Sequence, residues 1–275
     1  MALFLGVLVG AILGLTGAGG SIFAVPLLMA GLGWTLPQAA PVALLAVCAA
    51  ATFGTVVAWD VTYVRYRAAM LMALAGWFSA PLGLKAAAIL PVDLLTGLFA
   101  VVLVVVAVRL LVQTRSAPGD AGIVRARLSG DENPSAGRVV RLDGNGRIIW
   151  TTSAVLAMGT IGAGTGFLAG LLGVGGGFVI VPALRMVSGL SMHSIIATSL
   201  MAIALTSAGT VAAAMMQGHE MPWNAALPFL LGALVGMLLG RQLAPRIAGA
   251  RLQLGFAGLM LLVGITLGAH ALNFI

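Results

Sequence analysis

The chain has 275 residues, of which 61% are hydrophobic and only 8% are charged. Soluble domains carry about three times this share of charged residues, so the composition excludes a soluble globular protein and indicates a polytopic membrane protein. The net charge of +7 does not indicate nucleic-acid binding, because most basic residues lie between apolar stretches, where they report orientation in a membrane.

Ten apolar segments follow one another along the chain, five before and five after one polar stretch. They lie at about 2–17, 20–32, 38–59, 67–86, 92–113, 151–171, 176–190, 193–216, 222–244 and 249–272. Most approach the roughly 20 residues that a helix needs to cross a bilayer. We expect an all-α membrane protein with a first transmembrane repeat at 1–113, a cytoplasmic loop at 114–150 and a second repeat at 151–275.

A glycine-rich motif at 14–26 returns at 170–182, with seven of thirteen positions identical and an offset of 156 residues (170 − 14). Each copy joins a longer segment to one, at 20–32 or 176–190, that is short for a full crossing. We therefore expect each repeat to contain a glycine-broken helical hairpin followed by three transmembrane helices. Duplicated glycine clusters in apolar stretches are typical of the binding sites of secondary transporters.

The arginines predict the orientation of the chain in the membrane. Six arginines lie in 114–150 and others in the loops 60–67 and 241–251, so we place these three stretches in the cytoplasm. The loop 217–221 has no lysine or arginine and falls outside, while Lys85 does not fit the pattern. We expect a multi-pass protein of the bacterial inner membrane with both termini outside, so that the two repeats are inverted relative to each other.

The polar stretch at 114–150 ends in alternating residues on either side of Gly144 and Asn145, a pattern that favours a β-hairpin. A linker that joins the two repeats is the simpler interpretation of this stretch. A regulatory or partner-docking role is the alternative.

The contiguous glycines are the candidate binding elements. A broken helix in a membrane exposes free amides and the positive end of the helix dipole, which attract an anion. The candidate substrate-binding residues in the two motifs are Gly17, Gly19, Gly20, Ser21, Gly173, Gly175, Gly176 and Gly177. Close helix packing is the alternative, and we favour it for the glycines spaced by four at Gly6, Gly10, Gly14, Gly162, Gly166 and Gly170.

Hydroxyl side chains form a second candidate set. Thr198 and Ser199, which follow the second motif, are candidate substrate ligands, because neutral hydroxyl donors suit an oxyanion that must be released again. Thr52 and Thr55 are candidate coupling or gating residues in the first repeat, and Thr206, Ser207 and Thr210 are weaker candidates in the second. The alternative for each is a hydrogen bond back to its own helix.

Charged residues are scarce inside the apolar segments. Arg185 and His193 are candidate gating or proton-coupling residues, although Arg185 could instead reach lipid phosphate and His193 could simply begin a helix. No apolar segment carries an acid at its centre, which disfavours a carboxylate-based cation pump and favours an anionic substrate. The single cysteine and three histidines form no metal-binding pattern, so we expect neither metal nor cofactor.

At the two glycine motifs the chain resembles the TauE/SafE sulfite exporter family, also called the toluene-sulfonate uptake permeases. The resemblance rests on the second motif from Gly170 to Leu184, on Ile196–Leu200 and on the weaker first motif, and it spans nearly the whole chain outside 114–150. It implies a duplicated helical permease for sulfur-containing anions. The first motif departs from the second, with Gly-Ala-Gly-Gly-Ser in place of Gly-Val-Gly-Gly-Gly, so we expect an asymmetric site.

These observations predict a secondary transporter that works by alternating access. The resemblance implies sulfite, sulfoacetate or another organosulfonate as its substrate, with export as the expected direction. A proton, another ion or the substrate gradient would supply the energy, and a second copy of the chain, forming a homodimer, is a candidate partner beside the bilayer. A non-transporting membrane assembly or scaffold protein is the alternative. We expect that the protein is not an enzyme, because its sequence shows no credible pair of a nucleophile and a base.

Overall fold

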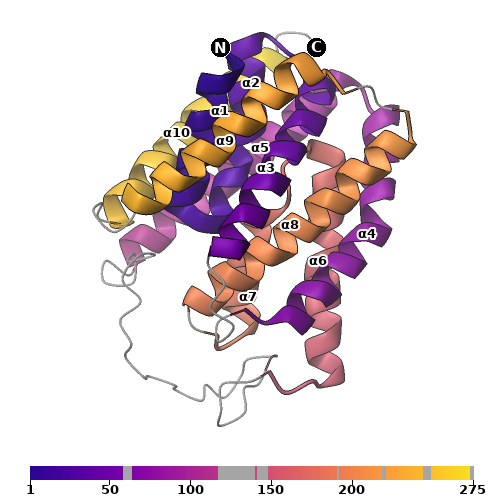
Figure 1. Cartoon of the computed structure of the whole chain (residues 1–275), viewed down its shortest axis with the longest axis vertical. Coiled ribbons are helices and arrows are strands. Elements are labelled where there is room, and N and C mark those ends of the chain that lie inside the picture. Colours follow the sequence, from indigo (N-terminus) through magenta and orange to yellow (C-terminus); the bar gives the residue numbers. More distant parts are fainter. Residues whose placement is uncertain are drawn as a thin grey trace.

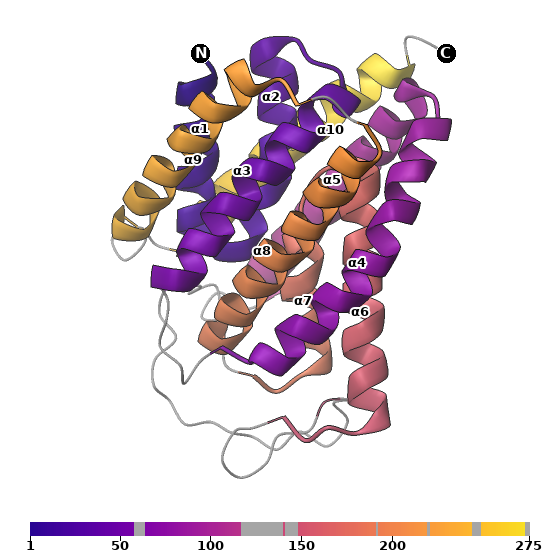
Figure 2. The ribbon, with the colours of Figure 1, turned by 45° about the vertical axis from the view of Figure 1, so that its right-hand side comes forward.

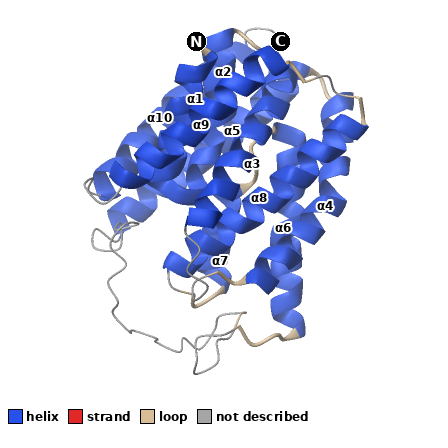
Figure 3. Ribbon diagram, in the orientation of Figure 1, coloured by secondary structure: helices blue, strands red, loops and turns tan. Residues whose placement is uncertain are grey.

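The described part of the chain is helical almost throughout, as Figure 3 shows. The structure is a computed structural model that describes residues 1–57, 64–116, 140, 148–190, 192–218, 221–243 and 249–272. Its helices are α1 (Ala2–Thr16), the 3-10 helix η1 (Gly17–Phe23), α2 (Ala24–Leu32), α3 (Leu36–Val57), α4 (Tyr66–Ile89), α5 (Val92–Ser116), α6 (Thr152–Leu172), α7 (Gly177–Val187), α8 (Met192–Met216), α9 (Trp223–Leu243) and α10 (Gly249–Leu272).

Six of these helices are long and apolar enough to cross a membrane: α3, α4, α5, α6, α8 and α9. Their outward faces carry large apolar side chains, such as Phe78 of α4 and Leu156 of α6, which are 82% and 63% exposed. A helix that is apolar on every face suits a membrane, where both protein and lipid surround it. The predicted polytopic all-α membrane fold is confirmed.

Local sequence sets several helix boundaries. Thr151 precedes α6, and its hydroxyl accepts a hydrogen bond from the amide of Ala154 at 3.3 Å, as an N-cap residue does. Gly33 ends α2 in the left-handed conformation, with φ of 66°, and its amide donates to the carbonyl of Met29.

Regularly spaced glycines bring two pairs of helices into backbone contact. In each pair a Cβ atom on the glycine would collide with a carbonyl oxygen of the neighbouring helix. In the α1–α9 pair the contacts join Gly6 to Phe229, Gly10 to Ala233 and Gly14 to Met237. In the α6–α4 pair they join Gly162 to Met72, Gly166 to Gly76 and Gly170 to Ala80. The spaced glycines therefore serve close packing, as we favoured for them.

The helix pairs follow the duplication that the sequence shows. The packing of α1 on α9 matches the packing of α6 on α4, while α3 packs on α8 and α5 packs on α10. The thiol of Cys48 donates to the carbonyl of Ala204 at 3.5 Å, and these two positions are separated by the repeat offset of 156. Corresponding positions that touch each other lie where the two halves of the bundle meet.

Corresponding helices begin at opposite ends of the molecule. Figures 1 and 2 place the start of α1 at one end, together with the last turns of α10, and the start of α6 at the other. The inverted orientation of the two repeats in a bilayer stays a prediction, as do the boundaries of the repeats. Most of the predicted β-hairpin at 138–150 falls outside the described residues. Val140 is described, and its amide donates to the carbonyl of Val187 at the end of α7, at 2.9 Å.

Candidate functional site

The junction between α6 and α7 is the candidate site. The helix stops at Leu172 and starts again at Gly177, so the interruption predicted for this motif is present. Gly173, Gly175 and Gly176 adopt left-handed φ angles of 72°, 68° and 69°, which residues with a side chain rarely adopt. Glycine is therefore required here by backbone conformation.

A side chain would also not fit at these positions, because the junction is buried among three helices. A Cβ on Gly173 would collide with Ala40 of α3, and one on Gly176 would lie 2.8 Å from the Cβ of Thr165 on α6. A Cβ on Gly175 would lie 2.9 Å from a methyl group of Val47 on α3. The backbone of the junction is thus packed directly against its neighbours in a closed arrangement.

Ser207 of α8 is a polar side chain that faces Gly175 of the junction. Its hydroxyl oxygen lies 3.1 Å from the position that a Cβ of Gly175 would occupy. The side chain is 0% exposed, and its hydroxyl has no hydrogen-bond partner in the structure. A buried hydroxyl without a partner costs free energy, and a hydrogen bond to a substrate would satisfy it.

The neighbouring hydroxyls differ from Ser207 because each already has a partner. On α8, Thr206 donates to the carbonyl of Ala202 at 2.8 Å, and Thr210 donates to that of Thr206 at 2.8 Å. In α6, Thr165 donates to the carbonyl of Gly162 at 2.9 Å. Among the buried hydroxyls near the junction, Ser207 is the one whose hydrogen-bonding capacity is open.

Thr198 and Ser199, the hydroxyls that sequence reasoning placed first, lie at the start of α8. Thr198 accepts a hydrogen bond from the backbone amide of Arg65 at 3.0 Å, directly before α4. Ser199 donates to the carbonyl of Ile196 at 2.9 Å. Because Thr198 precedes Ser207 by nine residues (207 − 198), it lies about 13 Å away along the helix axis. The described contacts therefore bring Ser207, rather than these two residues, to Gly175.

The gating candidates of the first repeat bond to their own helix. Thr52 donates to the carbonyl of Cys48 at 2.7 Å, and Thr55 donates to that of Ala51 at 2.8 Å. Arg185 is exposed in the last turn of α7, where a cation interacts favourably with the helix dipole. His193 lies in the first turn of α8, and its side chain is outside the described residues.

The first glycine motif meets the second inside the bundle. The stretch from Gly17 to Phe23 forms η1, which packs on α7 and contacts α3 and α8. Gly20 and Ser21 are buried there, and the side-chain surroundings of Gly17 and Gly19 are outside the described residues. The structure thus brings the two predicted binding elements together. At the repeat offset of 156, Ser207 corresponds to the buried Ala51 of α3, so the hydroxyl beside the motif belongs to one repeat alone.

Sequence reasoning ranked Ser207 below Thr198 because it had no means to separate a free hydroxyl from a bonded one. One signal was available: at the repeat offset, Ser207 stands where the first repeat has an alanine, about two and a half turns beyond Thr198 on the same helix.

Comparison with known proteins gives consistent results. The model of the family described as "Sulfite exporter TauE/SafE" matches residues 2–267. A "Probable membrane transporter protein" of Xylella fastidiosa (strain 9a5c) is 30% identical over 249 residues, which are 90% of this chain and 85% of the relative. A protein of the same description from strain Temecula1 is 29% identical over the same length. No solved structure gives a significant match. The chain belongs to the sulfite exporter TauE/SafE family and is a multi-pass membrane transporter, as its glycine motifs and its helical fold indicate.

Proposed function

We propose that this transporter exports a small sulfur-containing oxyanion, such as sulfite, sulfoacetate or another organosulfonate, across the bacterial inner membrane. The observation that carries the proposal is the buried Ser207 hydroxyl, which has no partner and lies against the left-handed glycine at Gly175. The description of the family as sulfite exporters supports the substrate class and the direction.

The chemistry of the junction suits an oxyanion. The first turn of a helix offers amides that have no acceptor within the helix, and α7 begins at Gly177, two residues after the Gly175 that Ser207 approaches. The amides of Val179 and Ile180 donate to the carbonyl of Gly176, so the amides of Gly177 and Phe178 are the candidate donors. These amides and the hydroxyl are neutral donors, so they stabilise a negative charge without fixing it in a permanent ion pair. Sulfite and sulfonate groups carry several acceptor oxygens, which match several donors converging from two helices.

The first repeat would complete the site from the other side. Gly17, Gly19, Gly20 and Ser21 belong to the motif that packs on α7 through η1. In this proposal their backbone contributes further donors, while Thr198 and Ser199 contribute to the pathway at the start of α8 rather than next to Gly175. The resulting site is asymmetric, because at the repeat offset Ser207 corresponds to Ala51 and Ser21 corresponds to Gly177.

Transport would proceed by alternating access between two arrangements of the repeats. The junction is closed in this structure, since Gly173–Gly177 are all buried, so an anion enters only when the helices around it move. The opposite starting ends of α1 and α6 support an inverted repeat, in which one motif faces each side of the membrane. The orientation with a cytoplasmic 114–150 loop and both termini outside belongs to this proposal.

Coupling would use a proton or another ion, or the substrate gradient alone. Arg185 and His193 lie near the two ends of the connection from α7 to α8, where a charged residue could control access to the junction. Thr52 and Thr55 remain candidates for gating on α3. In this proposal a homodimer contains two complete sites, one in each chain.

Flux into proteoliposomes tests the function. Protein reconstituted in liposomes should move sulfite or sulfoacetate down its gradient, with taurine as a third anion and with imposed proton gradients of both signs. Absence of flux for all three anions under every pH and voltage gradient would contradict the proposal.

A Ser207→Ala variant tests the site. Removing a hydroxyl that has no partner should leave stability unchanged or slightly higher, because no hydrogen bond of the fold is lost. We expect anion flux to fall about tenfold, the loss of one donor worth about 1.4 kcal/mol. Thr210→Val is the matched control, since Thr210 is buried on the same helix and bonds within it. Unchanged flux in Ser207→Ala would remove Ser207 from the site.

A further inference from the structure

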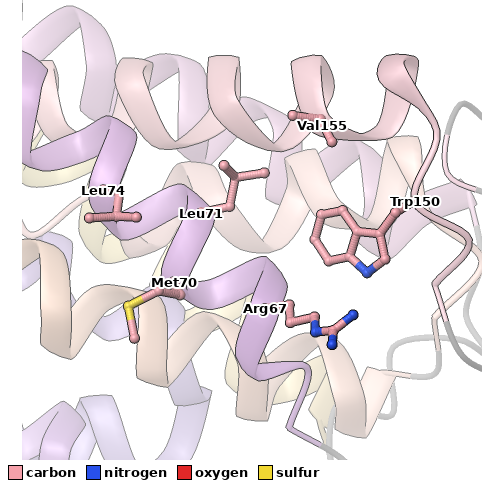
Figure 4. Close-up of a pocket in the computed structure, with 6 residues that line it drawn as sticks. All are labelled: Arg67, Met70, Leu71, Leu74, Trp150 and Val155. Carbon is pink, nitrogen blue, oxygen red and sulfur yellow. The ribbon is translucent and has the colours of Figure 1, made fainter.

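A shallow hollow of about 410 Å³ lies on the surface of the molecule between the first turns of α4 and α6 (Figure 4). We call it the α4–α6 groove. Its lining residues are Arg67, Met70, Leu71, Leu74, Trp150 and Val155. One of them is cationic, none is acidic, and the other five are apolar or aromatic. The groove is lined by residues other than those of the glycine junction.

The groove lies at the edge of the membrane-spanning zone. The candidate spans of α4 and α6 begin at Tyr66 and Thr152, and the two helices run parallel from there. Arg67 and Trp150 are thus at the boundary of the apolar zone, whereas Leu74 lies about two turns inside it. Met70, Leu74, Trp150 and Val155 are between 37% and 45% exposed, as side chains on a lipid-facing surface are. The occupant of such a groove comes from the bilayer.

The two ends of the groove differ in chemistry. Figure 4 shows the Arg67 guanidinium and the Trp150 indole nitrogen on the same side of the groove, with Leu71 and Leu74 further along α4 and Val155 on the α6 side. A guanidinium binds phosphate through two hydrogen bonds, and tryptophan prefers the depth of the lipid headgroups. The positive ends of the α4 and α6 dipoles add to the attraction for an anion at this end.

We propose that the α4–α6 groove binds one anionic membrane phospholipid, with its phosphate at Arg67 and Trp150 and part of an acyl chain along Leu71, Leu74 and Val155. The volume is at the small end of the range of about 300–1,000 Å³ for ligand pockets, so the groove holds part of one lipid. Lipid tails are as apolar as the groove, so the acyl contact gives little preference by itself. Selectivity therefore rests on the charge of the headgroup. This inference does not depend on the transported substrate.

Native mass spectrometry of the purified full chain tests this site. The protein in detergent is titrated with phosphatidylglycerol or with phosphatidylcholine of the same acyl chains. We expect one phosphatidylglycerol to bind more tightly than the rest, and more tightly than any phosphatidylcholine. Arg67→Gln should lower that affinity about fivefold, equivalent to about 1 kcal/mol for one basic residue at a membrane surface. Lys85→Gln, which removes an exposed cation near the opposite end of α4, should leave it unchanged.

A second variant tests the apolar part of the groove. Leu74→Trp places a larger side chain at a half-exposed position, so it fills the groove without disturbing the core. It should weaken the tight phosphatidylglycerol while the protein stays folded. The proposal is overturned if Arg67→Gln binds lipid as Lys85→Gln does, or if Leu74→Trp leaves binding unchanged. It is also overturned if the protein is a dimer that Leu74→Trp converts to a monomer, because a second chain would then occupy the groove.

Discussion

In the first repeat the chain from Gly17 to Phe23 remains helical as η1, whereas the corresponding stretch of the second repeat leaves the helix at three left-handed glycines. The two repeats also differ in a later helix, since α3 has Ala51 at the position where α8 has Ser207. Helix packing is nevertheless shared, because the α1–α9 and α6–α4 pairs use glycines at corresponding positions. Duplication has thus kept the helix packing of both halves, while the buried hydroxyl without a partner, Ser207, lies in the second repeat.

Gly176→Ala should have the largest effect, because it changes a left-handed glycine of the second motif, where the first motif forms the 3-10 helix η1. An alanine at a φ of 69° costs about 1–2 kcal/mol, and its Cβ would lie 2.8 Å from the Cβ of Thr165 and 3.0 Å from that residue's carbonyl oxygen. With roughly 1–3 kcal/mol for overpacking, we expect a loss of about 3 kcal/mol of stability and loss of anion flux. Thermal unfolding in detergent and proteoliposome flux measure these effects.

Gly164→Ala is the control for that variant, placed on α6, the helix that precedes the junction. Gly164 is exposed within α6, and its added Cβ would meet no atom within 4 Å. Alanine should stabilise this helix by about 0.5–1 kcal/mol. Equal stability losses in Gly164→Ala and Gly176→Ala would show that the junction has no special backbone requirement.

Gly10→Ala and Gly166→Ala test whether the two halves are packed alike. Gly10 approaches the carbonyl of Ala233, and Gly166 approaches the backbone of Gly76, so each substitution pushes two helices apart. We expect each to lose about 2 kcal/mol, within the range for overpacking, and the two losses to agree within about 1 kcal/mol. A large loss at one position and none at the other would contradict a shared scaffold. Thermal unfolding of the two variants side by side decides this.

The helices were largely predictable because the length and composition of an apolar run are local properties. The segment expected at 193–216 is α8 at Met192–Met216, and the short segment expected at 20–32 is the end of η1 together with α2. The partners of single hydroxyls were not predictable. Thr198 meets a backbone amide 133 residues away, and Ser207 meets the glycine junction, because of the rotation and register of packed helices that no local pattern encodes.

Arg241→Gln and Lys85→Gln compare a second pair of corresponding positions, separated by 156 residues. Arg241 donates to the carbonyl of Gly54 at 3.0 Å, near the end of α3, whereas Lys85 is exposed on α4. Arg241→Gln should lose about 1–2 kcal/mol, because a charge-assisted hydrogen bond to a helix end disappears. Lys85→Gln should stay within about 0.5 kcal/mol of the parent protein. Equal unfolding temperatures for the two variants would mean that the Arg241 contact contributes nothing to stability.

Ala51→Ser should have the smallest effect, and it asks whether the two repeats can exchange their polar chemistry. Ala51 is fully buried on α3, where a new serine can donate to the carbonyl four residues before it, so we expect less than about 1 kcal/mol of destabilisation. Combined with Ser207→Ala, it should leave anion flux within twofold of Ser207→Ala alone. The reason is geometric. Besides Ser207, the atoms nearest to a Cβ on Gly175 belong to Val47 on α3 and Ile203 on α8, and none belongs to position 51. Restored flux in the double variant would mean that a hydroxyl from either repeat serves the anion equally, and that the asymmetry between the two hairpins has no functional consequence.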